Sequence, residues 1–108
     1  MRLMVFFDLP TLTGKDMREY RVFRKYLIKN GFIMMQESVY SKLVLNNNST
    51  KVLRTQLKKH IPPKGLVQVL EITEKQFASI EYLVGNSQEK VVDNMDRVVF
   101  LWSWNLKI

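Results

Sequence analysis

The chain contains no cysteine among its 108 residues. Disulfide frameworks, thiolate zinc sites and thiol nucleophiles are therefore excluded, and nothing in the sequence favours an oxidising compartment. Histidine is almost absent too, because His60 is the only one, and no Ser–His–Asp catalytic set can be argued from the sequence. We expect a protein of a bacterial or archaeal cytoplasm.

Long hydrophobic runs are also missing. The apolar start of the chain stops at Asp8 after only a few residues, too short for a signal peptide or a membrane span. No repeats or low-complexity tracts occur. A length of 108 residues with 46% hydrophobic residues suits one domain with a single core. We therefore expect one soluble domain spanning residues 1–108, without a membrane partner.

Acidic residues are in short supply. Lys and Arg number 17 against 10 Asp and Glu, which gives a formal net charge of +7 and a sequence pI near 9.8. Such an imbalance favours a polyanionic partner, with nucleic acid as the first candidate. A membrane surface is the second candidate, but no basic amphipathic helix with an exposed bulky apolar face is evident. The alternative is charge that only keeps the protein soluble.

The first third of the chain predicts a strand and a helix. Leu3 to Leu9 is rich in β-branched and aromatic residues and reads as a buried strand. Thr13 stands three residues before Asp16, a spacing typical of a capping box, and the helix runs to Asn30, where Gly31 ends it. Asp8 is therefore expected at the carboxyl end of the first strand.

The middle of the chain predicts a pair of strands and a second helix. Residues 32–45 alternate in strand fashion, and we interpret them as two strands joined near Gln36 to Ser38, or as one long strand that carries a bulge. Asn46 to Asn48 read as a loop. Ser49 is then expected to cap a helix of roughly ten residues, which residues 62–65 terminate.

The last third predicts further strands. Leu66 to Ile72 reads as a strand, and Thr73 to Gln76 opens a short irregular or helical segment. Tyr82 to Val84 is a candidate for another short strand. Residues 85–96 are polar and loop-like, and Arg97 to Trp102 is a strongly apolar final strand.

This order of elements is typical of an α+β, ferredoxin-like (βαββαβ) domain, with an antiparallel sheet, two helices on one face and an extra C-terminal strand. Two helices cover only one face of the sheet, and the residues expected on the other face are largely apolar. A homodimer through the sheet is the natural prediction. The strand and tail at 97–108 would pair with an edge strand, including one of the partner protomer.

Basic residues recur on one face of the first predicted helix. Arg18, Arg21, Lys25 and Lys29 lie three or four residues apart and so form a continuous ridge, with Glu19 as the one acid nearby. A linear ridge can follow a nucleic-acid backbone, because each cation that neutralises a phosphate releases counterions. We therefore predict sequence-tolerant, salt-sensitive binding of nucleic acid along the ridge.

The second predicted helix adds to the basic surface with Lys51, Arg54, Lys58 and Lys59. Lysines near a helix C-terminus also offset the helix dipole, so this set has a purely structural alternative. His60 lies at the end of the same helix, where capping is favoured over catalysis.

Asp8 is the acid that stands out by position, because a carboxylate at a strand end can bind Mg²⁺ outside the core. The alternative is an Asp that only initiates a turn. One carboxylate does not make a nuclease, but a two-fold axis near Asp8 would place two copies across one shared metal. Ser38 and Ser41 are possible polar neighbours of such a site.

Four features together resemble the CRISPR-associated endoribonuclease family, type II branch. They are Phe7-Asp8 at the end of the first strand, the basic first helix, Gly31 to Tyr40 with its Gln-Glu-Ser-Val-Tyr, and Thr73 to Phe77. The resemblance covers nearly the whole chain. It implies a ferredoxin-like homodimer whose final strand packs onto the partner's sheet, with Asp8 as the Mg²⁺-binding, catalytic aspartate.

The resemblance also implies partners. The family's dimer is flanked by integrase dimers, which it bridges while it binds double-stranded protospacer DNA, and nuclease activity varies between members. The first hypothesis is thus a DNA scaffold for spacer integration. The second is a stand-alone Mg²⁺-dependent nuclease acting on RNA or DNA. A basic RNA-binding module of this fold is disfavoured, because residues 38–45 lack the Gly-aromatic signature of such domains.

Overall fold

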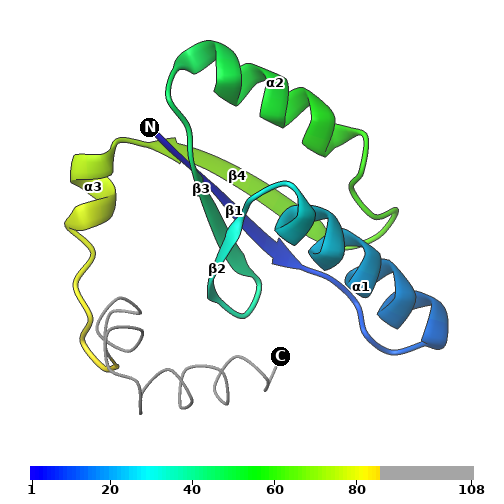
Figure 1. Ribbon diagram of the computed structural model, residues 1–108. Helices are drawn as coiled ribbons and strands as arrows, with labels where there is room; N and C mark the ends of the chain where they lie inside the picture. Colours follow the sequence, from blue (N-terminus) through cyan, green and yellow to red (C-terminus); the bar gives the residue numbers. More distant parts are fainter. Residues whose placement is uncertain (86–108) are drawn as a thin grey trace.

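The structure, a computed structural model, describes residues 1–85 and contains one four-stranded antiparallel sheet. The first strand, β1 (Arg2–Asp8), lies between β3 (Val39–Leu43) and β4 (Leu66–Ile72), and β2 (Ile33–Gln36) lies outside β3. β1 is therefore a central strand, paired on both sides along its length (Figure 1).

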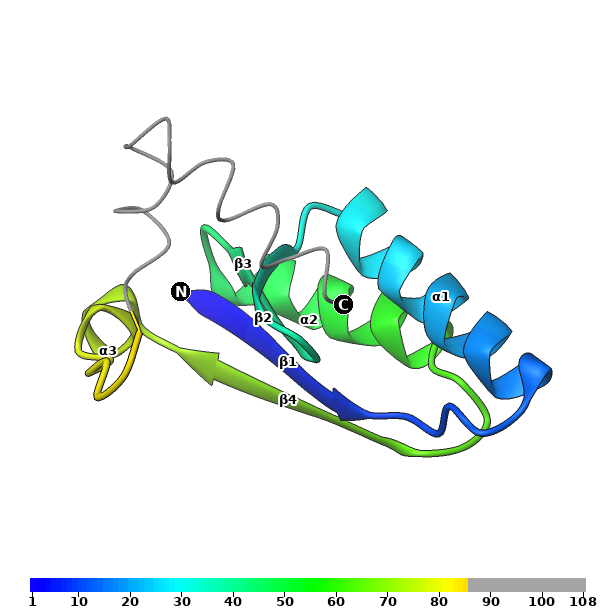
Figure 2. The same ribbon diagram turned by 90° about the horizontal axis from the view of Figure 1, so that it is seen from below.

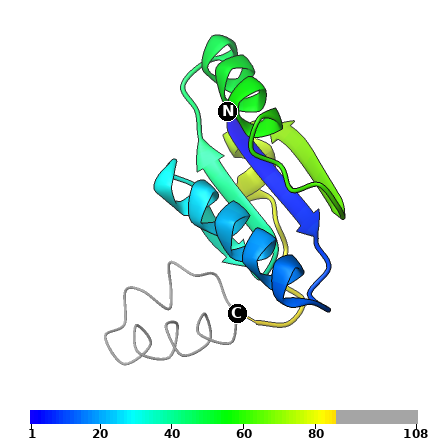
Figure 3. The ribbon, with the colours of Figure 1, turned by 90° about the vertical axis from the view of Figure 1, so that its right-hand side faces the viewer.

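Two long helices cover one face of this sheet. They are α1 (Gly14–Lys29) and α2 (Asn47–Lys58), and both lie on the same side of the strands in Figures 2 and 3. A short third helix, α3 (Glu74–Ala78), follows β4 near the beginning of β1. The element order and the strand order confirm the predicted ferredoxin-like fold. Among residues 1–85, every helix is too short or too polar to cross a bilayer.

The core forms between the helices and the inward side of β1. Leu3, Val5 and Phe7 alternate along the strand and are buried, as expected for residues that share one face. Phe7 packs edge-on against Phe23 of α1, with ring centroids 5.2 Å apart, and stacks on Tyr40 of β3 at 5.7 Å. Burial of such side chains supplies about 1.5–3 kcal/mol each. This packing fixes the end of β1 and therefore the position of Asp8.

The helix ends show which sequence signals determine the boundaries. Thr13 and Asp16 form the predicted capping box of α1, and Gly31 follows the helix with a φ of +88°. The prediction for α2 was wrong by one turn. Asn46, not Ser49, is the N-cap: its side chain accepts a hydrogen bond from the Ser49 amide at 2.9 Å, so the expected loop at 46–48 is largely the first turn of the helix.

Residues 32–45 form two strands, as the first interpretation predicted. The turn at Glu37 and Ser38 joins them, and Ser38 adopts a left-handed φ of 68°. A register shift between Met34 and Gln36 shows that the hairpin carries an irregularity as well.

The expectations for the last third have mixed outcomes. β4 has its predicted bounds, and Thr73 caps α3 through a capping box with Gln76. The strand expected at Tyr82 to Val84 was wrong: these residues form no strand and are exposed. The final strand at 97–102, and the polar segment before it from residue 86, lie outside the described residues.

The sheet face turned away from α1 and α2 is mostly apolar. Its apolar members alternate with the core residues and follow from the strand register: Met4, Phe6, Ile33, Val39, Leu43, Leu66, Leu70 and Ile72. Arg2, Asp8, Ser41 and Gln68 belong to the same face. Ile33, Leu43 and Leu70 have exposed fractions of 61%, 53% and 50%. Apolar surface of this kind marks a contact region in many soluble proteins.

Candidate nucleic-acid interface and the Asp8 strand end

The basic ridge of α1 faces solvent. Its four members, Arg18, Arg21, Lys25 and Lys29, are all exposed, because Phe23 and Leu27 occupy the opposite, buried side of the helix. Within the part of the chain that the structure describes, none of the four forms an ion pair. The ridge is therefore an unneutralised line of positive charge.

Two arginines outside the ridge, Arg2 and Arg54, are neutralised. Arg54 of α2 forms an ion pair with Glu71 of β4 at 2.7 Å, which removes it from the basic surface predicted for the second helix. Arg2 forms an ion pair with Glu74 of α3 at 2.7 Å and lies 4.0 Å from the ring centroid of Phe77. The hydrogen bond from Arg2 lowers the pKa of Glu74 from its ordinary value.

Arg24, next to the ridge in sequence, turns inward. Its Nε is buried without a hydrogen-bond partner, as is the hydroxyl of Tyr40. Burial raises the pKa of the Tyr40 phenol, and the nearby Arg24 guanidinium partly opposes this. The two groups thus interact electrostatically without an aligned hydrogen bond. Nothing in the spacing of either residue indicates this pairing, because sequence places them on different elements.

The second basic set extends along α2 to its C-terminal end. Lys51, Lys58 and Lys59 are exposed, and no ion pair involving them occurs in residues 1–85. His60 caps the helix end, since its Nδ1 lies 2.8 Å from the Gln56 carbonyl oxygen. This confirms the capping role favoured for His60.

Asp8 is exposed at the carboxyl end of β1. It alternates with the buried Phe7, so its side chain belongs to the sheet face opposite α1. The loop before β4 packs closely against this point: a Cβ on Gly65, whose φ is +97°, would lie 2.7 Å from the Asp8 carbonyl oxygen. Only glycine allows that approach without displacement. The position of Asp8 is therefore set by packing on two sides.

The two serines proposed as neighbours of Asp8 have different positions. The Ser38 carbonyl accepts a hydrogen bond from the Phe7 amide at 3.0 Å, which brings the hairpin turn beside the end of β1. Ser41 pairs with Met4, four residues back along β1, or about 13 Å from Asp8. Ser41 is fully buried and its Oγ accepts a hydrogen bond from Arg2. Ser38 is thus near Asp8 and Ser41 is not.

Within residues 1–85, metal-binding capacity near Asp8 is limited. Residues 1–85 contain no group of three His, Asp or Glu side chains placed to hold a metal ion. Mg²⁺ binds to proteins through one or two carboxylates and keeps several waters. A hydrated Mg²⁺ bound by Asp8 would therefore have at most one further carboxylate or imidazole ligand from residues 1–85.

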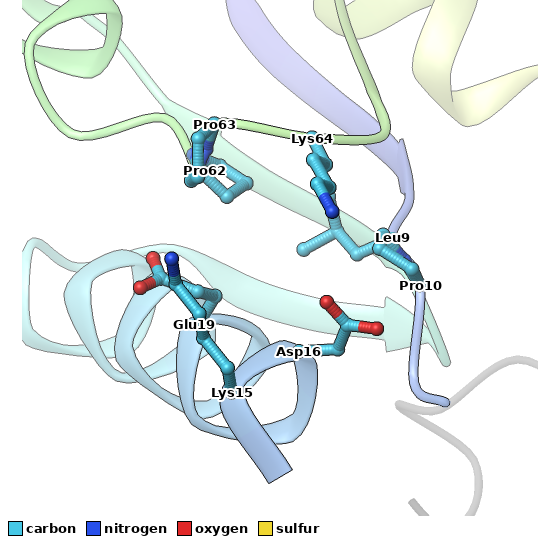
Figure 4. Close-up of a pocket in the computed structure, with 8 residues that line it drawn as sticks. All are labelled: Leu9, Pro10, Lys15, Asp16, Glu19, Pro62, Pro63 and Lys64. Carbon is cyan, nitrogen blue, oxygen red and sulfur yellow. The ribbon is translucent and has the colours of Figure 1, made fainter. Parts of the chain in front are cut away.

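A cleft of about 120 Å³ lies beside the end of β1, between the start of α1 and the loop before β4 (Figure 4). Leu9 and three prolines form its apolar part. Its charged residues are of both signs, with Lys15 and Lys64 beside Asp16 and Glu19. A mixed lining of this kind gives no net attraction for a polyanion, in contrast to the ridge.

The ridge and Asp8 lie on opposite sides of the molecule. α1 covers the inward face of the sheet and turns its ridge to solvent, whereas the Asp8 side chain belongs to the other face. A duplex lying on the ridge is therefore not presented to Asp8 of the same protomer.

Comparison with known proteins gives a consistent result. Residues 1–80 match the family model described as CRISPR associated protein Cas2. The CRISPR-associated endoribonuclease Cas2 of Treponema denticola is 50% identical over 101 residues, which cover 94% of this chain and all of that relative. The protein of the same name from Streptococcus mutans UA159 is 46% identical, covering 94% and 93%.

A crystal structure of Streptococcus pyogenes Cas2 at pH 6.5 has the same fold. It superposes with a TM-score of 0.60 at 18% sequence identity, covering 78% of this chain and all of that one. At this identity the likeness concerns the fold alone.

Proposed function

The chain belongs to the CRISPR-associated Cas2 family, and on that basis we propose that it is a nucleic-acid-binding subunit of the machinery that acquires new CRISPR spacers. Its ligand in this proposal is double-stranded protospacer DNA. Its partners are a second copy of itself and the integrase dimers, which the homodimer bridges.

The observation that carries the proposal is the unneutralised ridge on α1. From Arg18 to Lys29 the helix rises about 16 Å, and a duplex presents about one negative charge per 1.7 Å of its axis. All four cations are exposed and lack ion pairs within residues 1–85. Each can therefore exchange condensed counterions for a direct phosphate contact.

The separation of the ridge from Asp8 favours a scaffold over a self-contained nuclease. A nuclease acting within one protomer needs its phosphate-binding cations and its metal-binding carboxylate around one scissile bond. Here α1 carries the cations on one side of the sheet and Asp8 belongs to the other. Binding without cleavage is the activity that this arrangement supports best.

A homodimer through the open sheet face completes the proposal. Ile33, Leu43 and Leu70 are half-exposed on that face, and their burial against a second copy would remove apolar surface from water. Such a dimer would leave the α1 ridges on its two outer sides. A homodimer with two outward basic surfaces could hold a duplex while the integrase dimers bind at the ends of that homodimer.

Metal-dependent RNA or DNA cleavage is a second candidate function. It is favoured by the relatives, which are named endoribonucleases, and by the exposure of Asp8 beside the Ser38 turn. In this proposal Asp8 of each protomer supplies one carboxylate to a hydrated Mg²⁺ near the dimer axis. The bound ion would activate a water molecule for attack on a phosphodiester.

Assembly tests the main proposal. The chain, its integrase and a protospacer-length duplex are mixed and separated by size-exclusion chromatography with light scattering. We expect one complex containing all three, with two copies of this chain. A chain that enters no complex with either the duplex or the integrase would contradict the proposal.

Dimerisation is tested by charge on the open face. Leu70→Lys places an ammonium group in the expected interface, and sedimentation should show a monomer where the unaltered chain is a dimer. Val52→Lys, at an exposed position of α2, is the matched control and should remain dimeric. An unaltered chain that sediments as a monomer would exclude both the dimer and the shared metal.

Cleavage is tested with Asp8→Asn, which keeps the size of the side chain and removes its charge. RNA and DNA substrates are incubated with the chain in Mg²⁺ and in EDTA. If the second candidate is right, cleavage requires Mg²⁺ and disappears in Asp8→Asn. Cleavage that persists in the variant would remove Asp8 from the reaction.

A further inference from the structure

The C-terminal end of α2 contains an ordered, exposed histidine. The His60 ring stacks on Tyr26 of α1, with centroids 4.1 Å apart and planes 16° from parallel. Its Nδ1 lies 2.8 Å from the Gln56 carbonyl oxygen. One ring face and one nitrogen are thus fixed, although the residue as a whole is exposed. A histidine that only contacts solvent would make neither of these two contacts.

The hydrogen bond determines which nitrogen can change its protonation. A carbonyl oxygen only accepts hydrogen bonds, so Nδ1 must carry the proton that it donates to Gln56. The neutral ring therefore has its lone pair on Nε2. Protonation at Nε2 turns that atom from an acceptor into a donor and leaves the cap intact. The cap thus prepares Nε2 for a ligand that accepts hydrogen bonds.

The surroundings favour an anionic ligand. Lys58 and Lys59 precede His60 on the same helix end, and both are exposed without ion pairs within residues 1–85. The Tyr26 phenol adds no charge near neutral pH, because burial raises its pKa further above 10.0. Along this side of α1, Lys29 lies about one turn after Tyr26, near the end of the basic ridge.

Among residues 1–85, Glu19 and Lys64 are further charged residues on the segments next to His60. Glu19 lies on the same side of α1 as Tyr26, about 10 Å earlier along the axis, and Lys64 follows in the loop after His60. Glu19 and Lys64 line the same cleft, so their opposite charges offset one another. The charge presented around His60 is therefore mainly that of the lysines.

We propose that His60, with Lys58 and Lys59, is a second phosphate-contacting site for nucleic acid, in which protonated Nε2 donates a hydrogen bond to a backbone phosphate. The inference rests on the proposed nucleic-acid-binding function and extends it. The Tyr26–His60 stack joins this site to α1, so the basic surface continues from one helix to the other. The site adds one phosphate contact when His60 is protonated and loses it when the ring is neutral.

Two variants distinguish the hydrogen bond from His60 to the Gln56 carbonyl from the proposed hydrogen bond from His60 to phosphate. In His60→Asn the side-chain amide nitrogen lies near the place of Nδ1, so it can still donate to Gln56, but nothing replaces Nε2. In His60→Gln the amide nitrogen lies nearer the place of Nε2, and the cap is lost. Urea unfolding reports the structural role, and fluorescence anisotropy with a labelled duplex reports binding at about pH 5.5 and about pH 8.

We expect the salt dependence of duplex binding to show whether protonated His60 contacts a phosphate. For the unaltered chain, the slope of log K against log salt becomes steeper by about 0.9 at the lower pH, the value for one added phosphate contact. His60→Asn keeps the cap but loses the stack on Tyr26, so it should unfold at a urea concentration between those of the unaltered chain and His60→Gln, and it should show no such steepening. His60→Gln should unfold at a lower concentration and also lack the steepening.

Two outcomes would overturn the inference. In the first, the salt-dependence slope of duplex binding changes with pH by the same amount in the unaltered chain and in His60→Asn. That result would remove His60 from the interface and leave the proposed function in place. Absence of duplex binding at both pH values would overturn the proposed function and this inference together.

Discussion

Neutralising the α1 ridge should reduce the salt dependence of duplex binding by a calculable amount. The variant changes Arg18, Arg21 and Lys25 together to Gln, which removes the charges and keeps a similar helix propensity. All three are exposed and unpaired within residues 1–85, so their loss should leave the fold intact. The net charge falls from +7 by three units.

The magnitude follows from counterion release. Each phosphate contact contributes about 0.9 to the slope of log K against log salt, so three contacts contribute about 2.7. Between 50 and 200 mM salt, the fall in affinity should therefore be about 40-fold smaller in the variant than in the unaltered chain. Titration of a labelled duplex by fluorescence anisotropy at four or more salt concentrations measures both slopes.

A charge-matched control separates local contacts from net charge. Lys51, Lys64 and Lys75 are exposed and lie outside α1, and their joint replacement by Gln lowers the net charge equally. We expect this control to keep most of the slope. Equal slopes for the ridge variant and the unaltered chain, or an equal reduction in both variants, would refute the assignment of DNA binding to the ridge.

Three further predictions concern stability. Tyr40→Phe removes a buried hydroxyl that has no partner, so the free energy of unfolding in urea should stay unchanged or rise by about 1 kcal/mol. A decrease of about 1 kcal/mol in that free energy would show that the hydroxyl forms a hydrogen bond. Gly65→Ala forces a Cβ against the Asp8 carbonyl at positive φ and should lower the free energy of unfolding by more than about 1 kcal/mol; a stable variant would show that this loop can move. Arg2 holds the pKa of Glu74 below its ordinary 4.5. The stabilisation from this pair is therefore present above that pH and is lost as the pH falls below it. Urea unfolding of Glu74→Gln at several pH values should lack this loss of stability at acid pH.

Local sequence signals predicted the fold well where they involve neighbouring residues. Thr13 with Asp16 and Thr73 with Gln76 form capping boxes at the expected places, because a cap depends on residues three apart. The strand alternation of residues 66–72 likewise gave the bounds of β4. The one misplaced cap, Ser49 instead of Asn46, reflects two residues of similar capping preference within one turn.

Contacts between distant residues were not predictable from the same signals. Arg54 was assigned to the basic surface, yet Glu71 neutralises it from another element. Ser41 was expected beside Asp8, but the register pairs it with Met4 instead. The stacking of Tyr26 on His60 joins residues 34 positions apart. Each of these contacts depends on how the elements pack against one another. The periodicity of residues along one element carries no information about that packing.

The ridge itself was predictable because it lies on a single helix. Residues at intervals of three and four share a face whatever the tertiary context, and the structure places all four in solvent. The Asp8 site was predictable only in part. Its position at the strand end follows from the sequence, whereas the residues that approach it from other elements do not.

Spacer integration in vitro tests the central claim most directly. The integrase and a protospacer duplex are supplied with the unaltered chain, with Asp8→Ala, or with the ridge variant, and insertion into a CRISPR array substrate is measured. A DNA-binding scaffold predicts that Asp8→Ala supports integration while the ridge variant loses most of it. Integration that fails with Asp8→Ala but survives neutralisation of the ridge would contradict the account.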